Sequence, residues 1–122
     1  MELKSWIHFI EASGFRDEWR RLKLEEDDLW AIQSTIGFDP TSAPVVSGTG
    51  GLRKLRFAPP GSKGRRKWFR VCYVYFQRQA VVLLVVVYAK NELDDLSSAD
   101  KKFIRQMIER QQAAFEKRTG RP

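Results

Sequence analysis

Positively charged side chains crowd into one segment of this sequence, and they are the residues whose types and spacing can do chemistry. From Thr49 to Arg78 the chain has no Asp or Glu but holds nine lysines and arginines: Arg53, Lys54, Arg56, Lys63, Arg65, Arg66, Lys67, Arg70 and Arg78. Arginine grips phosphate oxygens through parallel hydrogen bonds, and lysine adds a point charge. The segment therefore predicts a surface for an anionic partner, with nucleic acid ahead of a membrane.

The spacing of these cations predicts that some of them share one face of a strand. In the stretch "LRKLRF", residues 52–57, Leu55 and Phe57 face one way, and Lys54 and Arg56 face the other. This alternation predicts a half-buried strand with a cationic open face.

Three further residues join this face if the neighbouring strands pair antiparallel. Arg70 enters the next expected strand, and Tyr88 and Lys90 are expected to share a face at the end of the last one. Cations gathered in this way neutralise phosphates, and an aromatic ring stacks on an exposed base. The patch therefore predicts RNA binding.

The same patch has side chains that RNA cleavage requires, although composition alone favours simple binding. A ribose 2′-OH can attack its own phosphate without a metal if the protein removes its proton, stabilises negative charge on phosphorus and protonates the departing 5′-oxygen. A lysine among arginines is a candidate base, because neighbouring positive charge favours loss of its proton. Arginine stabilises the charge but is a poor acid.

Other kinds of site are not supported. His8 is the only histidine and Cys72 the only cysteine, which leaves no histidine pair, Ser/His/Asp arrangement or thiolate cluster. The clustered acids are better explained as solvated helix starts than as a magnesium site. They are Glu25, Glu26, Asp27, Asp28, Asp94, Asp95 and Asp100. We expect no metal and no cofactor.

Length and composition indicate one globular domain. The 122 residues are 43% hydrophobic and carry a net charge of +7. The start "MELKSWIHF" lacks the pattern of a signal peptide, and the longest apolar run, residues 80–89, is too short for a membrane helix. We therefore expect one domain over residues 1–122, no membrane partner and a cytoplasmic location.

Hydrophobic periodicity predicts an α+β domain with a largely antiparallel sheet. The expected order is strand, helix, helix, strand, strand, strand, helix, over residues 5–12, 15–24, 25–38, 52–57, 68–76, 80–89 and 97–118. The last helix opens with the capping pattern Ser97-x-x-Asp100. Its apolar stripe is predicted to contain Phe103, Ile104, Met107, Ile108 and Phe115.

Three stretches taken together carry a resemblance to a known family: "GTGGLRKLRF", "RVCYVYF" and "LLVVVYAKNELDDLSSADKK". With them the sequence resembles the RelE/ParE superfamily of bacterial type II toxins, and most closely its HigB-like branch. The stretches "FIEASGFRDEW" and "EEDDLWAIQSTIGFDP" are similar to the first strand and helical hairpin of that branch. The resemblance covers nearly the whole chain and implies a small RelE-like α+β fold with an N-terminal strand, a helical hairpin and a C-terminal amphipathic helix.

The resemblance also implies an activity and a set of partners. RelE-like toxins enter the ribosomal A site and cleave translated mRNA through the 2′-OH, with a basic surface in place of a metal. The implied partners are the 70S ribosome with its mRNA and a cognate HigA-like antitoxin, and operator DNA is contacted only through the antitoxin complex. The ParE branch shares the fold but inhibits DNA gyrase, so a gyrase inhibitor and a non-catalytic RNA-binding module stay open as alternatives.

On matched positions the resemblance assigns catalytic roles to four residues. Lys54 is the candidate base, Arg56 and Arg70 hold and stabilise the phosphate, and Lys90 falls in the final-strand motif where these toxins place basic residues. Arg53 is expected to contact RNA or ribosome.

The remaining substrate-binding candidates come from positions where the sequence departs from the family pattern and from the basic turn between the expected strands 52–57 and 68–76. Asn91 stands beside Lys90 where the family often has a second basic residue, and Tyr88 or Trp68 takes the place of a stacking tyrosine. Leu52 is apolar where the family has a lysine. The turn residues are expected to attract rRNA or an acidic antitoxin segment: Lys63, Arg65, Arg66 and Lys67.

Overall fold

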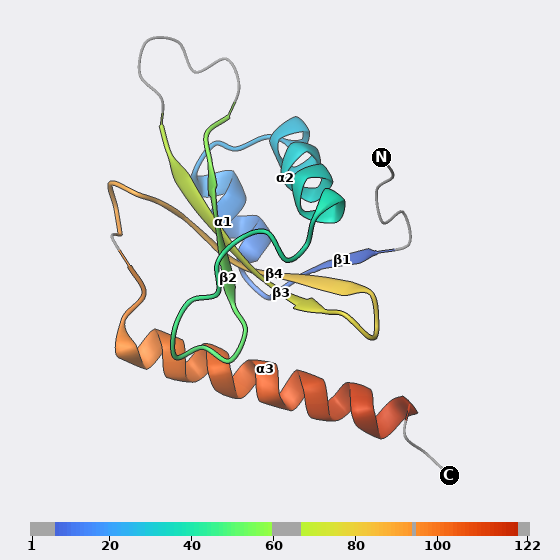
Figure 1. Cartoon of the computed structure of the whole chain (residues 1–122). Helices are drawn as coiled ribbons and strands as arrows, with labels where there is room; N and C mark the ends of the chain where they lie inside the picture. The colour runs from blue at the N-terminus through green and yellow to red at the C-terminus, as the bar shows by residue number, and fades with distance from the viewer. Residues whose placement is uncertain (1–6, 60–66, 94, 120–122) are drawn as a thin grey trace.

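The computed structural model describes residues 7–59, 67–93 and 95–119, and in Figure 1 the sheet lies between two layers of helices. The element order confirms the α+β prediction. It runs β1 (His8–Glu11), α1 (Phe15–Arg21), α2 (Glu26–Phe38), β2 (Arg53–Phe57), β3 (Phe69–Phe76), β4 (Val81–Ala89) and α3 (Ser98–Thr119).

Within the described residues, four strands form one sheet in the order β1-β4-β3-β2. β1 pairs with β4 in parallel, and β4 with β3 and β3 with β2 pair antiparallel. β3 and β4 occupy the centre because their residues are apolar on both faces, which suits strands covered from both sides. The strands expected to carry the cations therefore lie side by side as predicted.

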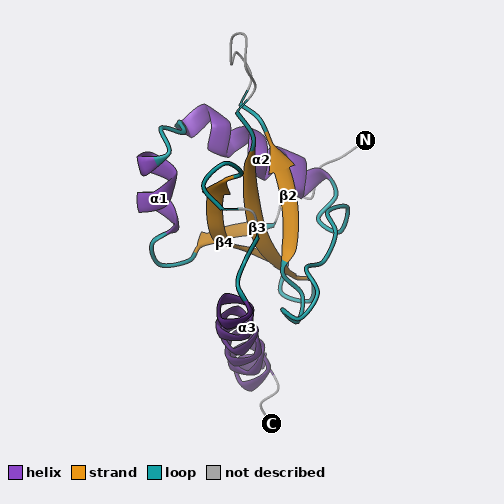
Figure 2. Ribbon diagram, turned by 90° about the vertical axis from the view of Figure 1, so that its left-hand side faces the viewer, coloured by secondary structure: helices purple, strands orange, loops and turns teal. Residues whose placement is uncertain are grey.

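Helices lie on both sides of the sheet (Figure 2), and each face of the sheet has its own apolar core. On one face α1 and α2 bury Phe15, Trp19 and Ile32 against Val71 and Tyr73. On the other face α3 packs onto the sheet through a second cluster, which includes Leu52, Cys72, Val74, Ile104 and Ile108.

The described members of the acid clusters lie at or just before the starts of α2 and α3, and Asp94 lies outside the described residues. The backbone N–H of Glu25 donates to Asp28 Oδ2 at 2.8 Å, just before α2. At α3 the Asp100 N–H donates to Ser97 Oγ at 3.0 Å, and the Ser97 N–H donates to Asp100 Oδ2 at 3.3 Å. This reciprocal pair is the capping box that the sequence predicts. The expected stripe on α3 needs one correction, because Phe103 is 62% exposed and points away from the sheet core.

The connection between α2 and β2 is fastened to the sheet at its first half. The buried Tyr73 hydroxyl donates to the Pro40 carbonyl oxygen at 2.8 Å. One guanidinium nitrogen of Arg53 donates to the carbonyl oxygens of Thr41 and Ala43, at 2.9 and 2.7 Å. These bonds hold residues 40–43 against the edge of β2.

The second half of the connection turns back onto β2 as a tight loop. The Val46 N–H donates to the Leu52 carbonyl oxygen at 2.7 Å, and the hydroxyl of the fully buried Thr49 donates to the Val46 carbonyl oxygen at 2.6 Å. Gly48 and Gly50 have φ of 83° and 78°, which residues with a Cβ rarely adopt. The loop is therefore fixed by hydrogen bonds and glycine geometry.

Tyr73→Phe is expected to lower the free energy of unfolding by about 1–2 kcal/mol, because the buried Pro40 carbonyl oxygen loses its donor. Urea denaturation followed by circular dichroism measures this. Tyr75→Phe is the matched control, since the described part of the structure records no hydrogen bond to the Tyr75 hydroxyl. An equal loss in both variants would contradict the assigned role of the Tyr73 hydroxyl.

Candidate functional site

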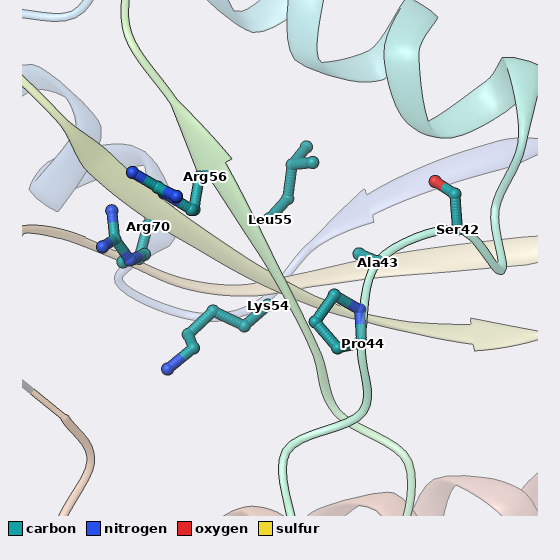
Figure 3. Close-up of a pocket in the computed structure, with 7 residues that line it drawn as sticks. All are labelled: Ser42, Ala43, Pro44, Lys54, Leu55, Arg56 and Arg70. Carbon is teal, nitrogen blue, oxygen red and sulfur yellow. The ribbon is translucent and has the colours of Figure 1, made fainter.

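A pocket of about 480 Å³ opens at the edge of the sheet, between β2 and the connection that precedes it (Figure 3). Ser42, Ala43 and Pro44 form one wall, and β2 and β3 form the other. Three cations line it, Lys54 and Arg56 from β2 and Arg70 from β3. The structure thus brings together three of the four residues to which the sequence assigns chemistry.

The strand register explains how the two arginines meet. Arg56 lies directly opposite Arg70 in the antiparallel pair of β2 and β3, and Lys54 lies two residues before Arg56 on the same face. Figure 3 shows the guanidinium groups of Arg56 and Arg70 on the same side of β2 as the Lys54 side chain. The side chain of Leu55 points away from these cations.

Arg70 is the unusual member of the group, because it is only 9% exposed. Its Nη1 donates to the Phe69 carbonyl oxygen at a long 3.4 Å, and no described carboxylate forms an ion pair with it. Arg56 is exposed, and its guanidinium carbon lies 5.0 Å from the centre of the Trp68 ring, a cation–π contact. Two positive charges therefore face each other at the pocket, and no acid of the described residues pairs with either of them.

Such an arrangement favours an anion in the pocket. Like charges directly opposite on a sheet repel, and a buried charge without a partner costs free energy. A phosphate oxygen pair bound by both guanidinium groups would remove the repulsion and supply the missing hydrogen bonds. The geometry suits a phosphate group better than a carboxylate on a flexible chain, because a phosphate offers oxygens to several donors at once.

Asp95 is a site residue that the sequence pattern does not reveal. Its Oδ1 lies 3.8 Å from Lys54 Nζ and also accepts the Leu96 N–H at 2.8 Å. That N–H, together with the charges of Lys54 and Lys101, holds the pKa of Asp95 below its usual range. No local signal could have found this ion pair, because the partners are far apart in the chain and meet only when α3 docks on the sheet.

The structure corrects the expectation that Tyr88 lies exposed with Lys90. Tyr88 is 5% exposed and packs with Cys72 in the core under α3. Burial raises the pKa of both groups to about 12. The Tyr88 hydroxyl has no hydrogen-bond partner among the described residues. In this conformation the ring face is covered, so Tyr88 cannot stack on a base.

The residues expected at the end of β4 lie in a turn beside the pocket strands. Lys90 and Asn91 are exposed beyond the last residue of β4, and the Lys90 N–H donates to the Trp68 carbonyl oxygen at 3.1 Å. Glu92 pairs with Arg21 of α1 at 2.7 Å and ties this turn to the helical layer. Lys90 is thus accessible, although it does not line the pocket.

The other predicted contacts divide into three groups. Arg53 is occupied by backbone carbonyl oxygens, and its strand position faces the core under α1 and α2, opposite Lys54. Trp68 is half-buried beneath Arg56, and exposed Lys67 has its Nζ 5.8 Å from the Phe69 ring centre. Lys63, Arg65 and Arg66 lie outside the described residues.

The described residues hold neither a metal cluster nor a membrane helix. Among them, no three His, Cys, Asp or Glu side chains gather closely enough to hold a metal ion. His8 is exposed on β1, away from the pocket. Over the same residues, none of the helices combines the length and the apolar character needed to cross a bilayer.

The architecture defines the class of fold, a small α+β domain with an open, mostly antiparallel sheet between a helical hairpin and a C-terminal helix. No family model matches the sequence. The structure is similar to that of the E. coli toxin RelE, solved in the free state as a double arginine-to-alanine mutant, with a TM-score of 0.51 and 16% sequence identity. The match covers 72% of this chain and 87% of the toxin. The fold is therefore RelE-like.

Tyr88→Phe is expected to leave the free energy of unfolding at pH 7 unchanged or slightly higher, because the hydroxyl has no hydrogen-bond partner to lose in the described part of the chain. Burial raises the pKa of Tyr88 to about 12, so the folded state favours the neutral phenol. The wild-type protein should therefore lose stability as the pH rises from about 10 to about 12, and the variant should lose less. Urea denaturation at several pH values measures both effects. A loss above about 1.5 kcal/mol at pH 7 would show that the hydroxyl has a partner.

Proposed function

We propose that this protein is a single-domain, HigB-type toxin of a type II toxin-antitoxin system that cleaves mRNA on the ribosome. The observation that carries the proposal is Arg70, buried beside Arg56 in a pocket and without an acidic partner among the described residues. A site built in this way needs an anion, and the RelE-like fold suggests that the anion is an mRNA phosphate.

The proposed reaction uses the ribose 2′-OH and needs no metal. Arg56 and Arg70 hold the non-bridging oxygens and stabilise the added negative charge. Lys54 first loses its own proton to solvent, and the neutral amine then takes the 2′-OH proton. The 2′-oxygen bonds to phosphorus as the bond to the 5′-oxygen breaks, which leaves a 2′,3′-cyclic phosphate. The departing 5′-oxygen takes a proton, and we propose as its donor the exposed Lys90, which falls where RelE-like toxins place basic residues.

Asp95 adds a step before the chemistry. Its carboxylate pairs with Lys54 in the free protein, so an entering RNA phosphate must displace it before Lys54 can reach the 2′-OH. The pair is partly exposed, with side-chain exposures of 30% and 55%, so displacing it costs little. Asp95 is then a positioning residue that holds Lys54 at the pocket until RNA arrives.

The proposed partners follow from charge and from exposed apolar residues. The net charge of +7 favours association with the ribosome and its mRNA, and a cognate HigA-like antitoxin would hold the toxin inactive. Trp30 on α2 is 69% exposed and Phe38 is 48% exposed, so this helix offers apolar anchors to such an antitoxin. Operator DNA would be bound only through that complex.

Lys54→Ala combined with Arg70→Ala is expected to reduce mRNA cleavage at least about 100-fold, because the reaction loses its base and one of the two groups that stabilise the phosphate. Primer extension on an mRNA translated in a purified system measures the cuts. The matched control is Lys117→Ala with Arg118→Ala, which removes the same charge from the exposed far end of α3.

Circular dichroism and thermal unfolding establish that both variants fold. Cuts that require ribosomes, persist in the control and vanish in the pocket variant support the proposal. Intact mRNA with wild-type protein would contradict it. A gyrase supercoiling assay would then test the ParE-like alternative, and RNA binding without cuts would indicate a non-catalytic binding module.

A further inference from the structure

A second cationic pocket lies outside the site described above, between α3 and the loop that precedes β2. It has a volume of about 230 Å³ and is lined by Gly48, Ser98, Lys101, Lys102 and Arg105. Figure 1 shows the loop between α2 and β2 reaching down to α3. The three cations stand on the first two turns of the helix, and not one of the lining side chains is apolar.

The loop wall of this pocket is rigid. Thr49 is fully buried, its hydroxyl bonds to Val46, and it accepts the Leu52 N–H at 3.0 Å. The glycine on each side of it has a positive φ, and at Gly50 an added Cβ would lie 3.5 Å from Arg105 Cγ. The backbone therefore approaches α3 closely and leaves a fixed hollow beside the three cations.

The charge in this pocket is largely unneutralised. Among the described residues, neither Lys101 nor Lys102 forms an ion pair, and Arg105 has only an exposed partner, Glu109, at 3.5 Å. An exposed ion pair of this kind contributes little free energy, so it does not hold the Arg105 charge in place. Three full charges, rather than the weak partial charge of a helix start, make the pocket attractive to an anion.

Asp95 links the two pockets. Its carboxylate lies 3.8 Å from Lys54 in the first pocket, and the charge of Lys101 in the second pocket also lowers its pKa. Both groups of cations therefore have a member close enough to act on the same carboxylate. A polyanion bound in the first pocket can continue past Asp95 to Lys101.

We propose that the second pocket binds a backbone phosphate of the same RNA strand that enters the Lys54 pocket. The inference rests on the proposed function for the identity of the ligand as RNA. Phosphate fits because the side-chain polar groups of the pocket are three cations and one hydroxyl, while the aliphatic stems of the cations form most of the remaining surface. A protein segment would need apolar or aromatic anchors, which the lining lacks. The RNA footprint thus extends from the sheet onto α3.

The test compares two triple variants of the full chain that lose the same charge from the same helix. The pocket variant removes the three cations of the pocket through Lys101→Gln, Lys102→Gln and Arg105→Gln. The control variant changes exposed positions further along α3, through Arg110→Gln, Lys117→Gln and Arg118→Gln. Glutamine is a good helix former and keeps the Cγ atom that a Cβ added at Gly50 would meet. The probe is a fluorescein-labelled single-stranded RNA with 2′-O-methyl groups, which cannot be cut through the 2′-OH.

Fluorescence anisotropy gives the dissociation constant at several salt concentrations. At about 0.1 M salt we expect the pocket variant to bind about tenfold more weakly and the control less than about threefold more weakly. The slope of log K against log salt should fall by about 0.7 for each phosphate that the variant no longer neutralises. Equal weakening in both variants would show that RNA binding depends on the net charge alone and would overturn the site. Wild-type affinity in the pocket variant would also overturn it, and so would the absence of RNA binding by the wild-type protein.

The result is separable from the proposed function, because the probe cannot be cleaved and no ribosome is present. Pocket-dependent RNA binding by a protein that cuts no mRNA would refute the nuclease and leave the site standing. If the pocket variant cleaves mRNA and binds RNA as well as the wild-type protein does, the second pocket is refuted and the nuclease stands. A Glu-rich peptide that binds through the three cations while RNA affinity stays unchanged would overturn the proposal in favour of a protein ligand.

Discussion

A guanidinium group that is buried without a carboxylate partner from the described residues is the constraint on which the rest of the structure depends. Arg70 lies opposite Arg56, and the described residues offer it only a carbonyl oxygen at 3.4 Å. Taking an unpaired charge out of water costs several kcal/mol, and the facing arginine adds repulsion. This arrangement persists only because apolar packing of β3 and β4 on both faces over-determines the position of the strand.

The extent of α3 decides where the face of the sheet changes from core to site. Leu52, Cys72 and Val74 lie under the helix and are buried in its apolar cluster. Further along the same strands and on the same face, Lys54 and Arg70 lie at the pocket instead. One alternation pattern thus serves two purposes, because each strand runs from beneath α3 into the pocket. The bonds from Tyr73 and Arg53 to the connection then build the opposite wall.

The sequence predicts the parts of this site that local periodicity encodes. Alternation places Lys54 and Arg56 together, and antiparallel pairing of neighbouring hairpin strands adds Arg70. The role of Arg53 and the burial of Tyr88 escape prediction, because each depends on what packs over the strand. The pairing of Asp95 with Lys54 depends on how the chain crosses from β4 to α3. A side chain's face follows from strand period, whereas its exposure follows from tertiary packing.

Among the described residues, the Asp95 carboxylate near two groups of cations gives the free protein a specific electrostatic state. The Leu96 N–H and the charges of Lys54 and Lys101 hold the pKa of Asp95 below its usual range, and the carboxylate weakens the repulsion between Lys54 and Lys101 without neutralising both. Arg56, Arg70 and Lys102 have no acidic partner among the described residues. Repulsion that is tolerated in the free fold is relieved when a polyanion binds, so part of the cost of assembling these cations returns as binding free energy. A fold with fully paired cations would be more stable when free and would bind phosphate more weakly.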